Sequence, residues 1–191
     1  MLARSPGSRA GSAPGRSTGA HILAAYIALL RAINVGGDVL PMPALLEMCR
    51  SAGFERARTY SASGNALFTS RLDAHKVKSA LASRLADYLG KPIDVHVRTA
   101  TELAAVLAGN PFPEAPPSRT VAVFLDTPPA AGELEAVRGR SREALALGTR
   151  EIYVLYPDGI AASKLVIPAA RTGTARNMNT VAKLAALAAA L

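Results

Sequence analysis

The first apolar run of the chain, residues 24–31, is apolar on both of its alternating faces. One face carries Tyr26, Ala28 and Leu30, and the other carries Ile27 and Leu29. A half-exposed edge strand would alternate polar and apolar residues. The run therefore predicts a central strand whose sheet is covered on both faces.

The rest of the first half alternates helical and extended patterns. It predicts a helix at 43–52, strands at 56–61 and 65–69 around a tight turn, a helix between Asp73 and Gly90, and a strand at 93–98. Pro43 suits a first helical turn, and Gly53 and Gly90 suit helix ends. The order β-α-β-β-α-β is that of the ferredoxin-like plait.

The second half repeats this order less completely. We predict a helix at 100–108, irregular chain at 110–119, a strand at 121–126, a helix at 130–147, two strands around Pro157-Asp158-Gly159, and a helix at 177–190. A fourth strand is missing, or is lent by a neighbour. The expected fold is α+β: tandem ferredoxin-like (α/β plait) subdomains packed together, with their bare sheet faces covering each other.

Composition divides the chain further. Residues 1–20 are rich in Gly, Ser and Pro and contain three arginines and no acid, which predicts a disordered tail or a misplaced start. The expected subdomains are residues 21–98 and 99–191. Without this tail the chain keeps 19 of its 22 basic residues and all 14 acidic ones. This moderate excess of positive charge fits an anionic ligand or an ordinary basic surface.

Several classes of protein are disfavoured. Cys49 is the single cysteine, so no internal disulfide or thiolate metal cluster can form, and the three histidines lack metal-ligand spacing. The apolar run at 22–30 is too short for a membrane span, which takes about 20 residues. We expect a cytoplasmic protein with no metal, no cofactor and no membrane partner.

Four polar clusters stand out as candidate binding residues. They are Arg31, Asn34, Gly36 and Gly37; Ser63, Gly64 and Asn65; Ser163 and Lys164; and Arg176, Asn177, Asn179 and Thr180. Glycine amides, Asn side chains and a helix N-terminus all suit an anion. Each cluster also has a plainer interpretation as a turn, a strand end or a helix cap.

No catalytic residue can be named. The dinucleotide and P-loop fingerprints are absent, Ser63 lacks a nucleophile elbow, and no pair of acids suggests a general acid and base. Whether the protein is an enzyme therefore stays open at the level of sequence.

Four motifs give a family resemblance. They are YIALLRAINVGG (26–37), RTYSASGNALF (58–68), SKL (163–165) and TARNMNTVAKL (174–184). In this order they resemble the bacterial domain of unknown function 1697 family, from about residue 24 to the end. The resemblance implies a cytoplasmic protein with two ferredoxin-like subdomains and no established activity, and it marks the four clusters as signature positions.

The chain also departs from that family. Ala32 stands where Gly is usual, Ala62 where Gln is usual, and Met178 where Trp is usual. The stretch between Lys164 and Arg176 is shorter than usual. The losses of Gln and Trp remove a hydrogen-bond donor and a stacking surface, so the resemblance does not by itself carry a ligand function of the family over to this chain.

The leading hypothesis is a pocket for a small anionic ligand, such as a nucleotide or phosphate ester. The four clusters would meet in it, with Arg31, Lys164 and Arg176 converging on one concave site to supply charge. The alternatives are nucleic-acid binding, for which nine Phe and Tyr residues and no Trp offer few stacking surfaces, and a protein-interaction module. The sequence does not give the ligand or the oligomeric state.

Overall fold

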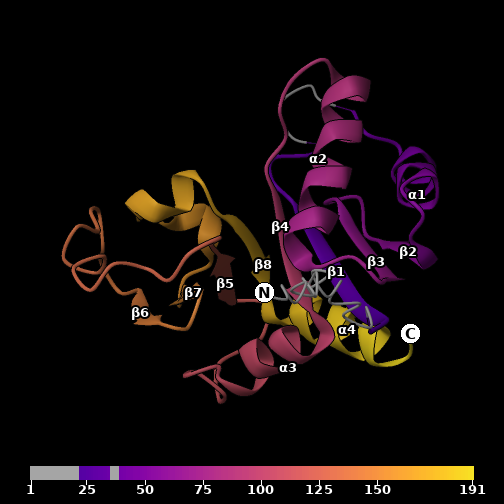
Figure 1. The fold of residues 1–191 in the computed structure, drawn as a ribbon. Coiled ribbons are helices and arrows are strands. Elements are labelled where there is room, and N and C mark those ends of the chain that lie inside the picture. Colours follow the sequence, from indigo (N-terminus) through magenta and orange to yellow (C-terminus); the bar gives the residue numbers. More distant parts are fainter. Residues whose placement is uncertain (1–21, 35–38) are drawn as a thin grey trace, which may run out of the picture.

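The computed structural model describes residues 22–34 and 39–191, which form two four-stranded antiparallel sheets and four α-helices (Figure 1). The first half comprises β1 (Ala24–Leu30), α1 (Met42–Ser51), β2 (Glu55–Tyr60), β3 (Asn65–Ser70), α2 (Ala74–Leu89), β4 (Val95–Thr99) and α3 (Ala100–Ala108). The second comprises β5 (Thr120–Phe124), β6 (Ala144–Leu147), β7 (Glu151–Leu155), the 3₁₀ turns η1 (Ile160–Ala162) and η2 (Pro168–Arg171), β8 (Thr174–Asn177) and α4 (Met178–Ala189).

The first sheet has the strand order β2-β3-β1-β4 and matches the expected elements closely. As the two-sided pattern predicts, β1 is central, with β3 and β4 antiparallel on its two sides. Asp73 caps α2 by accepting a hydrogen bond from the Lys76 amide at 2.8 Å, and Gly90 ends it at a φ of 70°. Tyr26 and Leu30 point into the core beneath α1 and α2.

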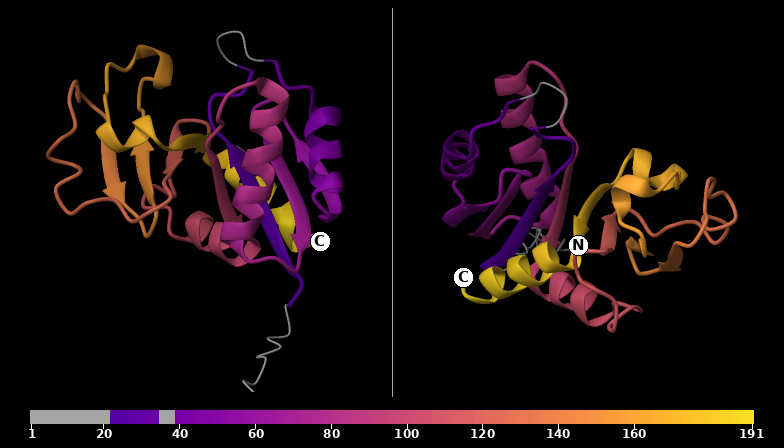
Figure 2. Two further views of the ribbon diagram at one scale, coloured as in Figure 1. Left: turned by 45° about the horizontal axis from the view of Figure 1, so that its top comes forward. Right: turned by 180° about the vertical axis from the view of Figure 1, so that it is seen from behind.

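The opposite face of the first sheet is covered by α3 and α4, which pack on each other and also contact the second sheet (Figures 1 and 2). The expectation that the two sheet faces cover each other directly is wrong, because this helix pair covers the face of the first sheet. One buried cluster joins Ile27 and Leu29 of β1 to Leu103 of α3, Leu184 of α4 and Phe124 of β5. In the described chain no helix is long and apolar enough to cross a membrane.

The second sheet has the order β6-β7-β5-β8, but the helix expected at 130–147 is absent. Residues 131–136 form turns, and only 144–147 are regular, as β6. Gly139 explains the break: its φ is 65°, and a Cβ there would lie 2.2 Å from the Lys164 carbonyl oxygen. The Ala and Leu residues that suggested a helix belong instead to a short edge strand.

The hairpin in this half is also shifted. We expected two strands around Pro157-Asp158-Gly159, but β7 pairs with the preceding β6, and the 3₁₀ turn η1 follows Gly159. The turn at Gly148 joins these two strands, and the Glu151 carboxylate occupies the space that a Cβ on Gly148 would need.

The fourth strand, expected to be missing or borrowed, is present as β8 and pairs with β5. It lies within the cluster that we interpreted as the start of the last helix, which begins at Met178. The four residues of β8 do not alternate apolar and polar side chains, so the sequence gives no strand signal there. The side chain that β8 buries is the charged Arg176, which is 7% exposed.

Candidate functional site

The two sheets carry the same pattern of pairing, which makes positions in the two halves equivalent. Ile27 of β1 lies opposite Arg98 of β4, as Ala122 of β5 lies opposite Arg176 of β8. Arg98 and Arg176 thus correspond, and each stands one residue before the cap of a following helix, Thr99 or Asn177.

Arg176 joins the two halves through its buried guanidinium. Its Nε donates to Asn65 Oδ1 at 2.7 Å, and its Nη2 donates to the carbonyls of Leu30 at 3.0 Å and Ser63 at 2.8 Å. Nη1 donates to Thr174 Oγ1 at 2.9 Å and to the Ala175 carbonyl at 2.8 Å. All five donors of this side chain therefore have acceptors within the protein.

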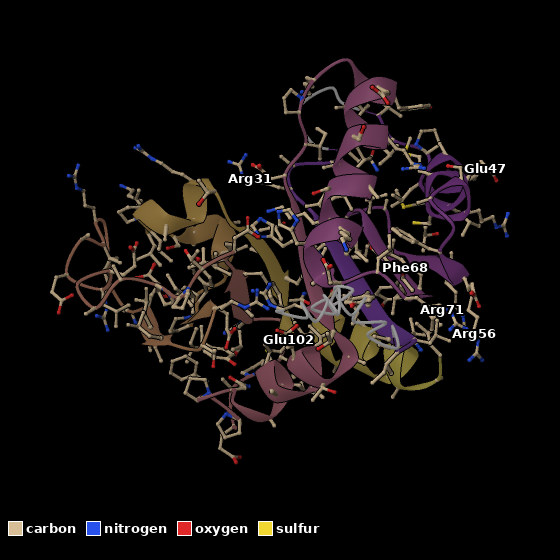
Figure 3. The ribbon with its side chains drawn as sticks, viewed as in Figure 1. Arg31, Glu47, Arg56, Phe68, Arg71 and Glu102 are labelled. Carbon is tan, nitrogen blue, oxygen red and sulfur yellow. The ribbon has the colours of Figure 1, made fainter. Side chains whose placement is uncertain are left out.

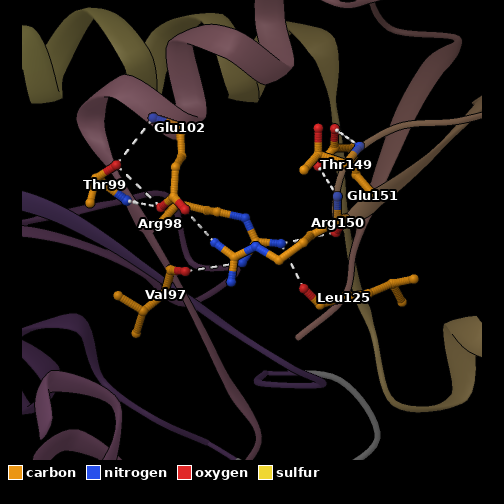
Figure 4. A network of polar contacts seen from close by, with 8 residues as sticks. All are labelled: Val97, Arg98, Thr99, Glu102, Leu125, Thr149, Arg150 and Glu151. Carbon is orange, nitrogen blue, oxygen red and sulfur yellow. Dashed lines mark hydrogen bonds and ion pairs between the residues drawn. The ribbon is translucent and has the colours of Figure 1, made fainter. Parts of the chain in front are cut away.

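Arg98, on β4 of the first half, makes the equivalent contacts with the second half (Figure 4). Its Nη2 donates to the carbonyls of Leu125 at 2.6 Å and Arg150 at 2.9 Å, and its guanidinium lies 5.5 Å from the centre of the Phe124 ring. In the shared register, Leu125 corresponds to Leu30. Two buried arginines at matching positions of the strand register thus contact the opposite halves.

The charges around the two arginines differ. Burial is the main cause that lowers the pKa of Arg98 to about 10, and the carboxylates of Glu102, Glu151 and Asp126 act in the opposite direction. Burial alone lowers the pKa of Arg176 to about 10. Within the described residues, no carboxylate balances the charge of Arg176.

Arg176 lines a hollow of about 310 Å³, here called the Arg31 hollow. It is lined by Leu30, Arg31, Ala32, Ile33, Ser63, Gly173, Thr174, Ala175 and Arg176. Figure 3 shows Arg31 at the boundary between the halves, where its side chain is 38% exposed and pairs with the exposed Asp94 at 3.7 Å. A long pair between exposed groups contributes little and exchanges readily.

The backbone of the hollow is strained. Ala32 and Asn34 have φ values of 53° and 59°, with Ile33 between them at negative φ. Alternating signs of φ of this kind occur in anion nests, in which successive amides face one concavity. In the chain that the structure describes, the Ala32 and Ile33 amides donate no hydrogen bond.

The other half shows what occupies the equivalent place. Asp126, which follows Leu125, corresponds to Arg31. Its carboxylate lies 3.3 Å from His96 Nδ1 and contacts the Lys78 ammonium. One half therefore has a carboxylate of its own beside its buried arginine, whereas the other half has a second cation there.

The remaining residues of the first two clusters support this hollow. Asn34 closes its own loop by donating to the carbonyls of Leu40 and Ala62. Gly64 has a φ of 73°, and a Cβ there would lie 3.0 Å from Leu30 Cβ, so the turn needs glycine. Asn65 also donates to the Tyr60 carbonyl. The candidates Gly36 and Gly37 lie outside the described residues.

The third cluster lies elsewhere. Ser163 and Lys164 line a separate hollow of about 270 Å³, the Lys164 hollow, with Gly139, Arg142 and Glu143 among its lining residues. Ser163 Oγ donates to the Glu143 carboxylate and accepts from the Leu165 amide. The structure brings Arg31 and Arg176 together and places Lys164 apart from them.

The residues of the last cluster make different kinds of contact. Asn177 caps α4 by accepting from the Thr180 amide at 3.0 Å, and Asn179 is exposed on the first turn of that helix. Asn177 therefore fits the plainer interpretation as a helix cap, Asn179 makes no cap contact, and the Arg176 side chain crosses the junction.

A further hollow was missed by the sequence interpretation. It has a volume of about 270 Å³ and lies between α3 and the β6–β7 hairpin, where Glu102 accepts from Arg150 at 2.5 Å. Glu102 also completes a capping box with Thr99, a signal visible in the sequence as Thr-x-x-Glu. Among the described residues, no group of three or more metal-ligating side chains gathers in any of these places.

Comparison with known proteins agrees with this architecture. The model of a family described as a protein of unknown function (DUF1697) matches residues 23–153. The structure of conserved bacterial protein SP0830 from Streptococcus pneumoniae is similar, with a TM-score of 0.73 and 21% identity over 87% of this chain and 99% of that one. No curated protein matches the chain. The likeness concerns the fold and brings no activity with it.

Proposed function

The chain belongs to the DUF1697 family of proteins of unknown function, and we propose that it binds a small anion in the Arg31 hollow. The observation that carries the proposal is Arg176, a buried cation without a balancing carboxylate among the described residues, in a hollow that Arg31 also lines. An uncompensated buried charge is costly, and a bound anion relieves that cost.

The two arginines have different roles in this proposal. Arg176 has no donor left for a ligand, so it acts through its charge and holds the Ser63 turn in place. Arg31 is partly exposed and weakly paired, so its guanidinium can turn to bind the anion directly. The Ala32 and Ile33 amides add donors at no cost in side-chain entropy.

The equivalent position in the other half supports the choice of ligand. There, the Asp126 carboxylate fills the space beside the buried arginine and contacts Lys78 and His96. A carboxylate or phosphate group is the corresponding occupant of the Arg31 hollow. A phosphate ester or nucleotide is the ligand class that we propose, because its anion presents several acceptors to Arg31 and the two amides.

The experiment is a thermal-shift titration with inorganic phosphate, pyrophosphate and adenosine phosphates. At ten times the Kd, a ligand stabilises by about 1.4 kcal/mol, a shift of about 3–6 °C for a chain of this length. Arg31→Ala should abolish the shift and leave the unliganded melting temperature within about 2 °C, since surface substitutions cost little.

Arg50→Ala is the matched control. Arg50 is an exposed arginine with one long ion pair, to Glu47 at 4.0 Å, on α1. Equal losses of the ligand shift in the two variants would mean that net charge, and not the hollow, attracts the anion, and the proposal would fail.

The tandem ferredoxin-like arrangement is the architecture that we propose with this function, with subdomains at residues 21–98 and 99–191. Support comes from the matching strand orders, β2-β3-β1-β4 and β6-β7-β5-β8, and from the equivalent arginine contacts. The second unit would have replaced its two covering helices by irregular chain. A cytoplasmic location is part of the same proposal, supported by the single, buried Cys49.

A further inference from the structure

The hollow between α3 and the β6–β7 hairpin contains hydrogen-bond donors that the protein leaves unused. Its volume is about 270 Å³, and Arg98 is one of its lining residues, so we call it the Arg98 hollow. Arg98 is 1% exposed, and it donates once through Nη1, to Val97, and twice through Nη2, to Leu125 and Arg150. In the part of the chain that the structure describes, its Nε–H and one N–H of Nη1 have no acceptor. A buried charged donor without an acceptor is costly, so a ligand that supplies one is favoured.

The strand register explains why Nε of Arg98 has no acceptor. Glu151 of β7 occupies the position in the second sheet that Asn65 of β3 occupies in the first. Asn65 accepts from Nε of Arg176 at 2.7 Å. The Glu151 carboxylate instead accepts from the amides of residues 149 and 150, at 3.0 and 3.1 Å. The side chain equivalent to the acceptor of Arg176 therefore makes its hydrogen bonds within its own hairpin.

The charges that line the Arg98 hollow balance each other. Its charged lining residues are Arg98, Arg150, Glu102 and Glu151, two cations and two carboxylates (Figure 4). Arg150 pairs with Glu102 at 2.5 Å. An anion would meet two carboxylates here and a cation would meet two guanidinium groups. The Arg98 hollow therefore suits an uncharged molecule, in contrast with the Arg31 hollow.

The other lining residues add apolar surface. Val106 and Leu147 contribute aliphatic side chains that are 4% and 37% exposed. The Tyr153 hydroxyl donates to the Val106 carbonyl at 2.8 Å, which fixes the tyrosine ring against α3. Pockets for drug-sized ligands have volumes of about 300–1,000 Å³, so a hollow of about 270 Å³ suits one small ring system.

From these observations we propose that the Arg98 hollow binds an uncharged heterocycle with a carbonyl beside an N–H or amino group, the chemistry of a nucleobase such as guanine or cytosine. The carbonyl oxygen or a ring nitrogen accepts from Nε of Arg98, and the amino group donates to Glu102 or Glu151. Arginine pairs in this way with guanine, and carboxylates with the amino group of cytosine, when proteins recognise bases. The site is separate from the Arg31 hollow and does not depend on an anion there.

The test is a ¹H–¹⁵N NMR titration of the full chain with guanosine and with cytidine, which carry a base but no phosphate. Saturable shifts of Arg98 Nε and of the Thr149 and Arg150 amides are expected, with a Kd of about 1 mM or below. Purine riboside, which lacks both the carbonyl and the amino group, should bind at least about tenfold more weakly, because it offers the carboxylates no donor.

Two variants on α3 form a matched pair. Ala105 lines the Arg98 hollow from an exposed position, so Ala105→Phe should fill the hollow and lower the affinity for guanosine at least about tenfold. Ala104 is the neighbouring exposed alanine and is not among the lining residues, so Ala104→Phe should keep the affinity within about twofold. Arg31→Ala should also keep it, because Arg31 belongs to the other hollow.

Arg98→Lys keeps the charge but removes the Nε donor, and it should also weaken guanosine binding at least about tenfold. Circular dichroism of each variant confirms folding, and the two α3 variants decide the question if Arg98→Lys does not fold. Inorganic phosphate should leave guanosine binding unchanged, which separates this site from the Arg31 hollow. Any of four results would overturn the proposal: no saturable shift with guanosine or cytidine, equal affinity for purine riboside, equal losses in the two α3 variants, or displacement of guanosine by phosphate.

Discussion

Replacing Arg176 by methionine is expected to destabilise the fold by about 3–5 kcal/mol. The five N–H groups of the side chain make six hydrogen bonds, and four of these cross from β8 to the first half, at Leu30, Ser63, Gly64 and Asn65. Methionine is apolar and of similar length, so it fills part of the space but leaves these acceptors without a donor.

The magnitude follows from two opposing effects. Hydrogen bonds from a charged donor contribute about 1.5 kcal/mol each, so one from each of the five N–H groups gives about 7 kcal/mol. Desolvation, which lowers the pKa of Arg176 to about 10, offsets about 3 kcal/mol of that gain. For a chain of this length, the net loss lowers the melting temperature by about 10 °C.

The assay is urea unfolding followed by circular dichroism, with Arg50→Met as the control for loss of an exposed arginine. Arg176→Lys, which keeps the charge but loses the fork of donors, should fall between wild type and Arg176→Met. A loss below about 1 kcal/mol for Arg176→Met would refute the view that this residue joins the halves.

Three further substitutions and conditions test other parts of the structure. Ala32→Gly should stabilise by about 0.5–1 kcal/mol in urea unfolding, because it relieves the φ of 53°; a loss would show that Ala32 is not strained. Gly139→Ala should lower the free energy of unfolding by at least about 2 kcal/mol, since its Cβ would meet the Lys164 carbonyl. Gly53→Ala, at a φ of 76° with open space around it, should lower it by about 1 kcal/mol. Equal losses in the two variants would contradict the close packing at Gly139. Burial lowers the pKa of His96, so the unfolded chain binds a proton more readily than the folded chain does. The free energy of unfolding should therefore fall as the pH drops below about 6.5. Thermal melts at several pH values should show much less of this pH dependence for His96→Gln.

The first half was predictable because each element carries its own strong pattern. The two-sided strand at 24–30 and the α2 helix between Asp73 and Gly90 follow from alternation, a cap and a stop. The second half was not, because its deciding contacts are tertiary. Gly139 adopts a non-helical φ of 65° and packs so closely on the Lys164 carbonyl, 25 residues further along the chain, that no side chain would fit there.

The candidate site was predictable in part. Arg31 and Arg176 were identified as cations beside small polar residues, and the structure places both at one hollow. Arg98 was missed because one arginine in an apolar strand resembles an exposed edge position, and only the equivalence with Arg176 reveals its role. That equivalence depends on strand register, which no local pattern specifies.

The structure gives a physical explanation for two of the departures from the pattern that the family resemblance implies. Ala32, where the family resemblance leads us to expect glycine, adopts a φ that glycine accepts without strain. Met178, where the family resemblance leads us to expect tryptophan, is 2% exposed within the buried cluster that joins the two sheets, so it is a core residue in this chain. Ala62 is exposed, and its carbonyl accepts from Asn34.

The central claim is that an anion binds between Arg31 and Arg176, and its most direct test is a phosphate titration followed by ¹H–¹⁵N NMR. The account predicts saturable shifts of the Ala32 and Ile33 amides and of Arg31 Nε, absent in Arg31→Ala and retained in Arg50→Ala. Saturable shifts confined to other regions, or no saturable shift with phosphate, pyrophosphate or adenosine phosphates, would contradict it.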